Sequence, residues 1–212
     1  MDFTRMKLGR KPFRYNAVTP KFAKYMALMT TLPVAPATAD WTTKVTNLGM
    51  MLNDQLGDCV CADMGHQEQV WTAANGNQVI VPDNAVLALY ESACGYVPGN
   101  PNTDQGCVID DVLAYMAKTG IGSYKIDGFA DFSPSRTDLV QDAVAYFGGC
   151  TLGVELPLAW QTASEWDAPP AGQRPVGQWQ PNSWGGHCVP VVKYDTTGAY
   201  VITWGSIVKM TW

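Results

Sequence analysis

The heptapeptide NDQLGDC, residues 53–59, ends in a cysteine at the start of a helical pattern. A cysteine in this position lies in the field of unpaired backbone amides, which favours the thiolate over the thiol. Gly57 permits a tight turn into the helix, and the side-chain amides of Asn53 and Gln55 can donate hydrogen bonds to a developing oxyanion. The pattern favours a nucleophilic Cys59. The alternative is that Cys59 packs as a small buried hydrophobic residue.

A second stretch, WGGHCVPVV at 184–192, places His187 at the head of an apolar strand. The chain has only two histidines, His66 and His187, so any histidine chemistry depends on one of them. A cysteine early on a helix, followed 128 residues later by a histidine on a strand, has the order expected of a thiol hydrolase.

Between and around these two stretches, the chain separates helical from extended patterns. With 47% apolar and 16% charged residues it is neither a disordered chain nor a coiled coil, and no apolar run reaches the ~20 residues of a membrane helix. Helices first and strands second predict an α+β fold of two lobes. The predicted helices are 59–74, 83–93, 109–118 and 137–147, and the predicted strands are 151–156, 189–192, 200–204 and 208–212. The predicted organisation is a basic extended arm at 1–45, a helical lobe at 46–150, and a long loop with a β lobe at 151–212.

The positive charge is concentrated at the N-terminus. Seven of the 14 basic residues lie in the first 24 positions, against a single acid, so the remaining 188 residues carry 7 − 18 = −11. Such an arm is expected to strap across its own acidic chain or to dock on an acidic protein surface or a nucleic acid. The alternative is a solvated tail that a few aromatic residues hold in place. No later basic surface with interleaved aromatic residues follows, so we expect neither nucleic-acid recognition nor membrane binding.

The chain resembles the papain-like cysteine peptidases, and in particular their divergent bacterial and phage-encoded relatives. The resemblance spans residues 52–205 and rests on the heptapeptide 53–59, DDVLAY at 110–115 before Gly120-Ile121, GHCV at 186–189, Tyr194-Asp195, and TWG at 203–205. It implies an N-terminal helical lobe, a C-terminal antiparallel β lobe built as a truncated barrel, and a cleft between them. By position it makes Cys59 the nucleophile and His187 the base, with Asn53 as the oxyanion donor and Gln55 as its substitute from a shifted register.

The residues that depart from the family pattern leave two functions open. The asparagine expected to orient the histidine is replaced, and Thr203 is the candidate that could hold the imidazole instead. Asp58 precedes the nucleophile, where its carboxylate either raises the pKa of the thiol or caps the helix. The first function is a hydrolase that cleaves peptide or isopeptide amide bonds through a thiolate–imidazolium pair. The second is a weak or inactive relative that serves as a structural or interaction protein of a phage-like particle or another assembly.

Beyond the proposed nucleophile Cys59, we expect no further cysteine chemistry and no metal site. Cys59 and Cys61 with His66 look like part of a metal site, but on a regular helix Cys61 points about 200° away from Cys59, so the two cannot share an ion. We expect no metal and no cofactor. An apolar stretch near the N-terminus is too interrupted by prolines for a signal peptide. The expected location is therefore cytoplasmic, or virion-associated if the protein is phage-encoded, with all six cysteines as free thiols. A final strand at 208–212 would leave a sheet edge through which chains could assemble.

Overall fold

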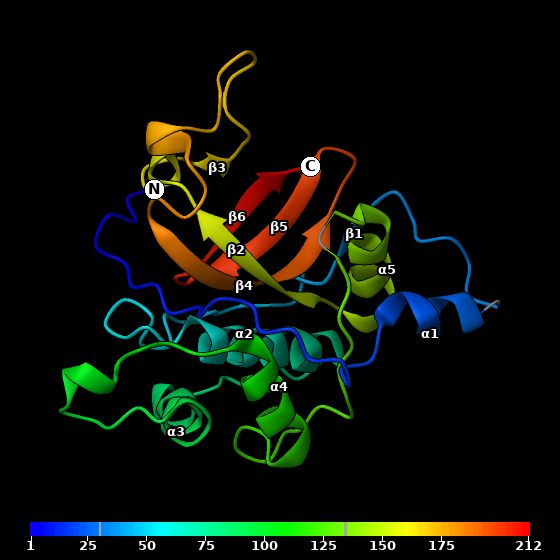
Figure 1. Ribbon diagram of the computed structural model, residues 1–212. Helices are drawn as coiled ribbons and strands as arrows, with labels where there is room; N and C mark the ends of the chain where they lie inside the picture. The colour runs from blue at the N-terminus through cyan, green and yellow to red at the C-terminus, as the bar shows by residue number, and fades with distance from the viewer. Residues whose placement is uncertain (30, 134) are drawn as a thin grey trace.

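The computed structural model describes residues 1–29, 31–133 and 135–212, and within them the chain forms an α+β fold of two lobes. Figure 1 shows one lobe of helices below a curled sheet. The helices are α1 (Phe22–Leu28), α2 (Cys59–Ala74), α3 (Asp83–Cys94), α4 (Ile109–Lys118) and α5 (Thr137–Phe147). The strands are β1 (Ala39–Asp40), β2 (Cys150–Leu156), β3 (Glu165–Trp166), β4 (Gly185–Tyr194), β5 (Gly198–Thr203) and β6 (Ser206–Thr211). Short 3₁₀ turns form η1 (Pro101–Thr103), η2 (Leu158–Trp160) and η3 (Gly177–Trp179).

Helix α2 is the central element, and it is buried on nearly every side. Thirteen of its 16 residues are buried, because the helix packs against α3 and α4 on one side and against β4 on the other. A single apolar stripe is therefore not needed, and polar residues of α2 find partners inside the fold. His66 is buried, with its Nε2 3.3 Å from the carbonyl oxygen of Gly49.

The sheet has the strand order β1-β4-β5-β6-β3, with β2 antiparallel to β4. Long strands β4, β5 and β6 form an antiparallel meander, and β2 places Val154 opposite His187. The open edge expected at 208–212 is partly closed, because β3 pairs with β6 in parallel at Lys209 and Met210.

The N-terminal arm (residues 1–45) folds back on its own chain as an intramolecular strap. Lys21 Nζ lies 2.6 Å from Asp131, Arg14 pairs with Asp111, and Phe22 packs against Phe132. The expectation of an arm extended throughout is wrong at α1. The apolar side of that helix, which includes Phe22, packs against α5, and such packing rather than helix propensity stabilises a helix this short.

Two further expectations are settled by the described residues. Cys94 and Cys107 form a disulfide, so the prediction of six free thiols is wrong for this pair. Their Cα atoms lie 5.4 Å apart, within the usual range for disulfides. Among these residues no helix is long and apolar enough to span a membrane.

Candidate active site

Cys59 and His187 line one small cavity where α2 meets β4. Cys59 is the first residue of α2, and the backbone groups of Cys188 and Gly9 act to lower the pKa of its thiol. His187 stands on β4, the strand that packs against α2. The fold therefore brings together two residues that lie 128 positions apart in the sequence. Residues that line the cavity are Asn53, Cys59, Ala62, Asp63, His66, His187, Cys188, Pro190, Ile202, Thr203 and Trp204.

The imidazole of His187 is held on one edge and one face. Its Nε2 lies 2.8 Å from Oγ1 of Thr203, the last residue of β5. The ring stacks on the indole of Trp204, with centroids 4.4 Å apart and planes 13° from parallel. Nδ1 is buried and has no hydrogen-bond partner among the described residues. One ring nitrogen is thus fixed by a hydroxyl, and the other is left free for proton transfer.

Trp204 was not among the residues expected to form the site. It adopts a positive φ of 46° at the turn between β5 and β6, which turns its indole back over His187. Phe3 and Trp184 pack on the same indole, at centroid distances of 4.8 and 5.4 Å. In the sequence Trp204 belongs to TWG at 203–205, one of the motifs of the resemblance, but no role was assigned to it.

The two amide side chains proposed as oxyanion donors have different surroundings. Asn53 is buried at the cavity, and its Nδ2 donates to Oδ1 of Asp58 at 3.1 Å and to the carbonyl of Leu56 at 3.2 Å. Gln55 is exposed and does not line the cavity. The turn before α2 leaves Gln55 at the surface, so the cavity gives no support for Gln55 in place of Asn53.

Asp58 does not cap α2. Of the two effects left open by the sequence, only the effect of its charge on the pKa of the Cys59 thiol therefore remains. Its side chain makes no capping hydrogen bond and instead accepts from Asn53. Burial raises the pKa of the Asp58 carboxyl well above its ordinary value. When it is ionised, the Asp58 carboxylate raises the pKa of the Cys59 thiol, which is the first of the two effects left open by the sequence.

The turn that delivers Cys59 is fixed from the helical lobe by Asp104. Its Oδ1 accepts from the backbone N–H of Gly57 at 2.9 Å and from the hydroxyl of Tyr90 at 2.7 Å. Tyr90 in turn accepts from the N–H of Gly106 at 2.9 Å. This network ties the segment before α2 to α3 and to the loop before α4.

The arm runs close to Cys59 and His187 and hydrogen-bonds to both lobes. On the helical side, Cys107 N–H donates to the carbonyl of Gly9 at 2.7 Å, and Lys11 N–H donates to the carbonyl of Cys107 at 2.8 Å. On the sheet side, Arg10 N–H donates to the carbonyl of Gly186 at 3.1 Å, directly before His187. Figure 1 shows this blue segment running between the sheet and the helices.

Glycines on both sides allow the backbone of the arm to approach this closely. A Cβ at Gly9 would lie 1.7 Å from the carbonyl oxygen of Gly57, and a Cβ at Gly106 would lie 1.9 Å from the carbonyl oxygen of Gly9. Cys59 is only 1% exposed. Sequence analysis noted the charge of the arm but not these glycines, whose meaning depends on long-range pairing.

No protein-family model matches the sequence, and no curated protein matches it. Several solved structures, however, are similar to this chain in fold. Xylellain, a cysteine protease from Xylella fastidiosa, superposes with a TM-score of 0.68 over 98% of this chain and 90% of its own, at 14% identity. Digestive procathepsin L 3 of Tenebrio molitor gives a TM-score of 0.61 over 99% and 71%, at 16% identity. The Carica candamarcensis cysteine protease CMS1MS2 in complex with E-64 gives 0.56 over 83% and 89%, at 15% identity.

The chain has a papain-like fold.

In this papain-like chain the covered site holds neutral groups rather than the expected thiolate–imidazolium pair. Burial raises the pKa of the Cys59 thiol to about 12, even though the N–H groups of Cys188 and Gly9 oppose the shift. Burial also lowers the pKa of His187 to about 3, and the nearby Arg10 cation acts in the same direction. The ion pair is therefore disfavoured in this conformation, because the arm and the two lobes together exclude water from both side chains.

Proposed function

We propose that the chain is a papain-like cysteine hydrolase that cleaves peptide or isopeptide amide bonds. The observation that carries the proposal is the arrangement at one cavity: Cys59 at the start of α2, and His187 fixed by Thr203 and stacked on Trp204. A thiol, an imidazole with one free nitrogen and a group that orients the imidazole are the parts that nucleophilic acyl transfer requires.

The proposed reaction proceeds through a thioester. The Cys59 thiol transfers its proton to Nδ1 of His187, and the sulfur attacks the carbonyl carbon of the amide. The imidazolium then protonates the leaving nitrogen, so the C–N bond breaks and an acyl-thioester remains on Cys59. Water, deprotonated by His187, hydrolyses this thioester and restores the thiol. Throughout, the Thr203 hydroxyl accepts the Nε2–H of His187 and keeps Nδ1 directed at the reaction.

Asn53 is the proposed side-chain donor to the oxyanion. In the covered site both of its hydrogen bonds go to the protein, to Asp58 and Leu56. For catalysis one of them has to be exchanged for a bond to the substrate oxygen. Loss of one such donor costs about 10²–10³ in kcat in other acyl transferases.

We further propose that this hydrolase is held latent by its own arm, which must move before a substrate can reach Cys59. Support comes from the backbone hydrogen bonds of Gly9 and Arg10, which hold the arm between the two lobes beside Cys59 and His187.

Hydrolysis of a fluorogenic peptide library by three variants tests the proposed function. Gly9→Ala introduces the Cβ that collides with the carbonyl of Gly57, so it should unseat the arm and give measurable turnover. Adding Cys59→Ala should abolish that turnover with little change in the thermal midpoint. Gly128→Ala is the matched control, because a Cβ there meets no atom within 4 Å. Turnover that survives Cys59→Ala, or no turnover in Gly9→Ala, would contradict the proposal.

A further inference from the structure

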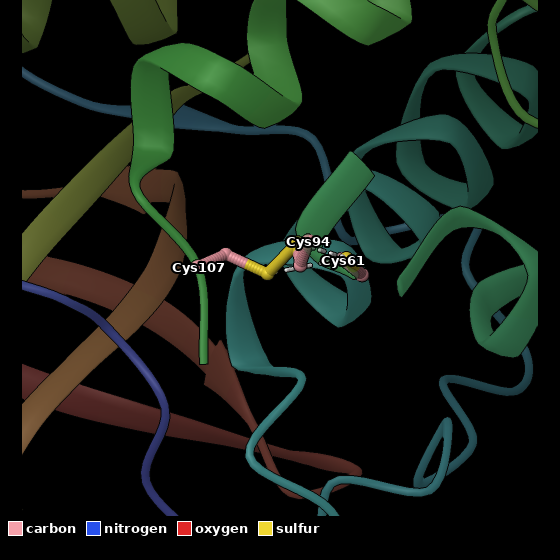
Figure 2. Close-up of side chains that lie close together, drawn as sticks. All are labelled: Cys61, Cys94 and Cys107. Atoms are coloured by element: carbon pink, nitrogen blue, oxygen red, sulfur yellow. Dashed lines mark hydrogen bonds between the residues drawn. A yellow bond between two sulfur atoms is a disulfide. The ribbon is translucent and has the colours of Figure 1, made fainter. Parts of the chain in front are cut away.

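Three cysteine sulfurs meet inside the helical lobe, outside the site described above. Cys61 comes from α2, Cys94 from the end of α3, and Cys107 from the loop before α4 (Figure 2). Cys94 and Cys107 form the disulfide, and the sulfur of Cys61 lies 3.9 Å from each of their sulfurs. Because Cys61 is two residues after Cys59 on the same helix, it faces away from the candidate active site and toward this cluster.

The spacing of these sulfurs matches the spacing of metal-bound thiolates. With a Zn–S bond of about 2.3 Å, neighbouring sulfurs of a tetrahedral zinc site lie about 3.8 Å apart. Two of the three sulfur–sulfur distances here are 3.9 Å. Only the third pair, the disulfide, is too close, and its reduction would allow these two sulfurs to separate.

The cluster is buried in the helical lobe, where Cys61 and Cys107 are 0% and 1% exposed. A soft metal ion has to displace the thiol protons on coordination, so binding to the reduced cluster should strengthen as the pH rises.

We propose that Cys61, Cys94 and Cys107 form a redox-gated metal site, closed as a disulfide when oxidised and able to bind one Zn²⁺ as a tri-thiolate when reduced. In the first step an external dithiol gives two electrons and two protons to the Cys94–Cys107 bond, and is itself released as a disulfide. In the second step the three thiols form three Zn–S bonds and release three protons, with the fourth zinc position left to water.

The site borders the covered cleft through Cys107. The backbone of this residue donates to Gly9 and accepts from Lys11 of the arm, while its sulfur belongs to the cluster. The metal site is independent of catalysis, and its test needs no activity.

Metal titration of the full-length protein tests the proposal. The protein is reduced with a phosphine, freed of metal with a chelator, desalted under argon and titrated with Co²⁺ and then Zn²⁺. We expect one equivalent of Co²⁺ to give near-ultraviolet thiolate charge-transfer absorption, and Zn²⁺ to abolish it. The unreduced protein should show no such absorption, since two of the three ligands are then locked in the disulfide.

Cysteine variants locate the binding. Cys61→Ser leaves the disulfide pair intact as residues and should weaken Co²⁺ binding at least 100-fold after reduction. Cys150→Ser, at a free cysteine that is not part of the cluster, should bind as the parent does. Binding that is unaffected by Cys61→Ser overturns the proposal, as does reduced protein that binds no Co²⁺ while its circular dichroism is unchanged. Unfolding on reduction that zinc does not reverse overturns it as well.

Discussion

At the scale of single residues, the imidazole of His187 depends on one hydroxyl. Thr203 Oγ1 is the partner of Nε2, and the stacked Trp204 limits rotation of the ring but offers it no acceptor. A buried imidazole that becomes charged during turnover needs an acceptor for each N–H, so the hydroxyl contributes mainly when His187 is protonated.

Replacement of Thr203 should therefore affect turnover more than folding. In the Gly9→Ala background, Thr203→Val keeps the shape of the side chain and removes the acceptor, so kcat should fall at least tenfold. Thr203→Ser keeps the hydroxyl and should retain most of kcat. Peptide hydrolysis across pH 5–9 measures both variants. Equal kcat values for the valine and serine variants would mean that Thr203 does not orient His187.

Asp63 gives a residue-scale prediction about pH. Its carboxylate accepts from Thr151 at 2.6 Å and from Gln67 at 3.1 Å, yet burial raises its pKa from 3.8 to about 7. As the pH rises from about 4 to about 7, the unfolded chain loses this proton while the folded chain retains it. The free energy of unfolding therefore falls across this window and levels off above it.

Asp63→Asn removes that titration and keeps an acceptor for the same two donors. The thermal midpoint of the variant minus that of the parent should rise between pH 4.5 and 7.5, by an amount on the order of 5 °C. Calorimetry at both pH values measures the difference, and the other titrating groups act alike in the two proteins. A difference that stays constant with pH would show that Asp63 is ionised in the folded chain.

At this scale, the role of a residue could be predicted from the sequence only where that role depends on its near neighbours in the chain. Cys59 and His187 could be predicted because each follows a glycine near the start of an element. The exposure of Gln55 could not, because the turn that carries it is also held by Asp104, which lies 49 residues further along the chain and accepts from Gly57. The stacking of Trp204 on His187 likewise depends on the positive φ of Trp204, which no local sequence pattern predicted.

At the scale of elements, Asp104 connects three of them. The segment before α2, helix α3 and the loop before α4 all meet at its carboxylate or at its partner Tyr90. This network could not be predicted from the sequence, because the sequence around Asp104 indicates only a turn.

Asp104→Ala should lower the thermal midpoint by about 6–12 °C. The reason is that the Gly57 N–H and the Tyr90 hydroxyl lose a charged acceptor, at about 1.5–3 kcal/mol each. Asp127→Ala, at an exposed carboxylate, is the control and should change the midpoint by less than about 2 °C. Thermal unfolding followed by circular dichroism measures both. A midpoint within 2 °C of the parent for Asp104→Ala would refute the role of this network.

The elements that sequence analysis predicted are those with local start and stop signals. Helices α3 and α5 end where Gly95 and Gly148 adopt left-handed backbone conformations, and both ends were placed to within one residue. Helix α1 and strand β3 were not predicted, since seven and two residues are too few for a periodic pattern. Their formation depends on contacts with α5 and β6, which only the folded chain provides.

At the scale of the whole molecule, the arm joins both lobes close to Cys59 and His187. Its backbone hydrogen-bonds to Cys107 on the helical side and to Gly186 on the sheet side. Three of the seven basic side chains in its first 24 positions, those of Arg10, Arg14 and Lys21, pair with acidic ones on the body. The charge asymmetry visible in the sequence is thus partly compensated within the chain. Displacing the arm would return water to Cys59 and His187 and reverse the main cause of both pKa shifts.

The rate at which iodoacetamide alkylates Cys59 at pH 5.5, followed by peptide mass spectrometry, tests this account most directly. We predict slow labelling in the parent, at least tenfold faster labelling of Cys59 alone in Gly9→Ala, and loss of that gain in Gly9→Ala/His187→Ala. This outcome would mean that an activated thiol lies beneath the arm and requires His187. Labelling of Gly9→Ala that rises only toward pH 8.5, or that is indifferent to His187, would show an ordinary thiol and contradict the account.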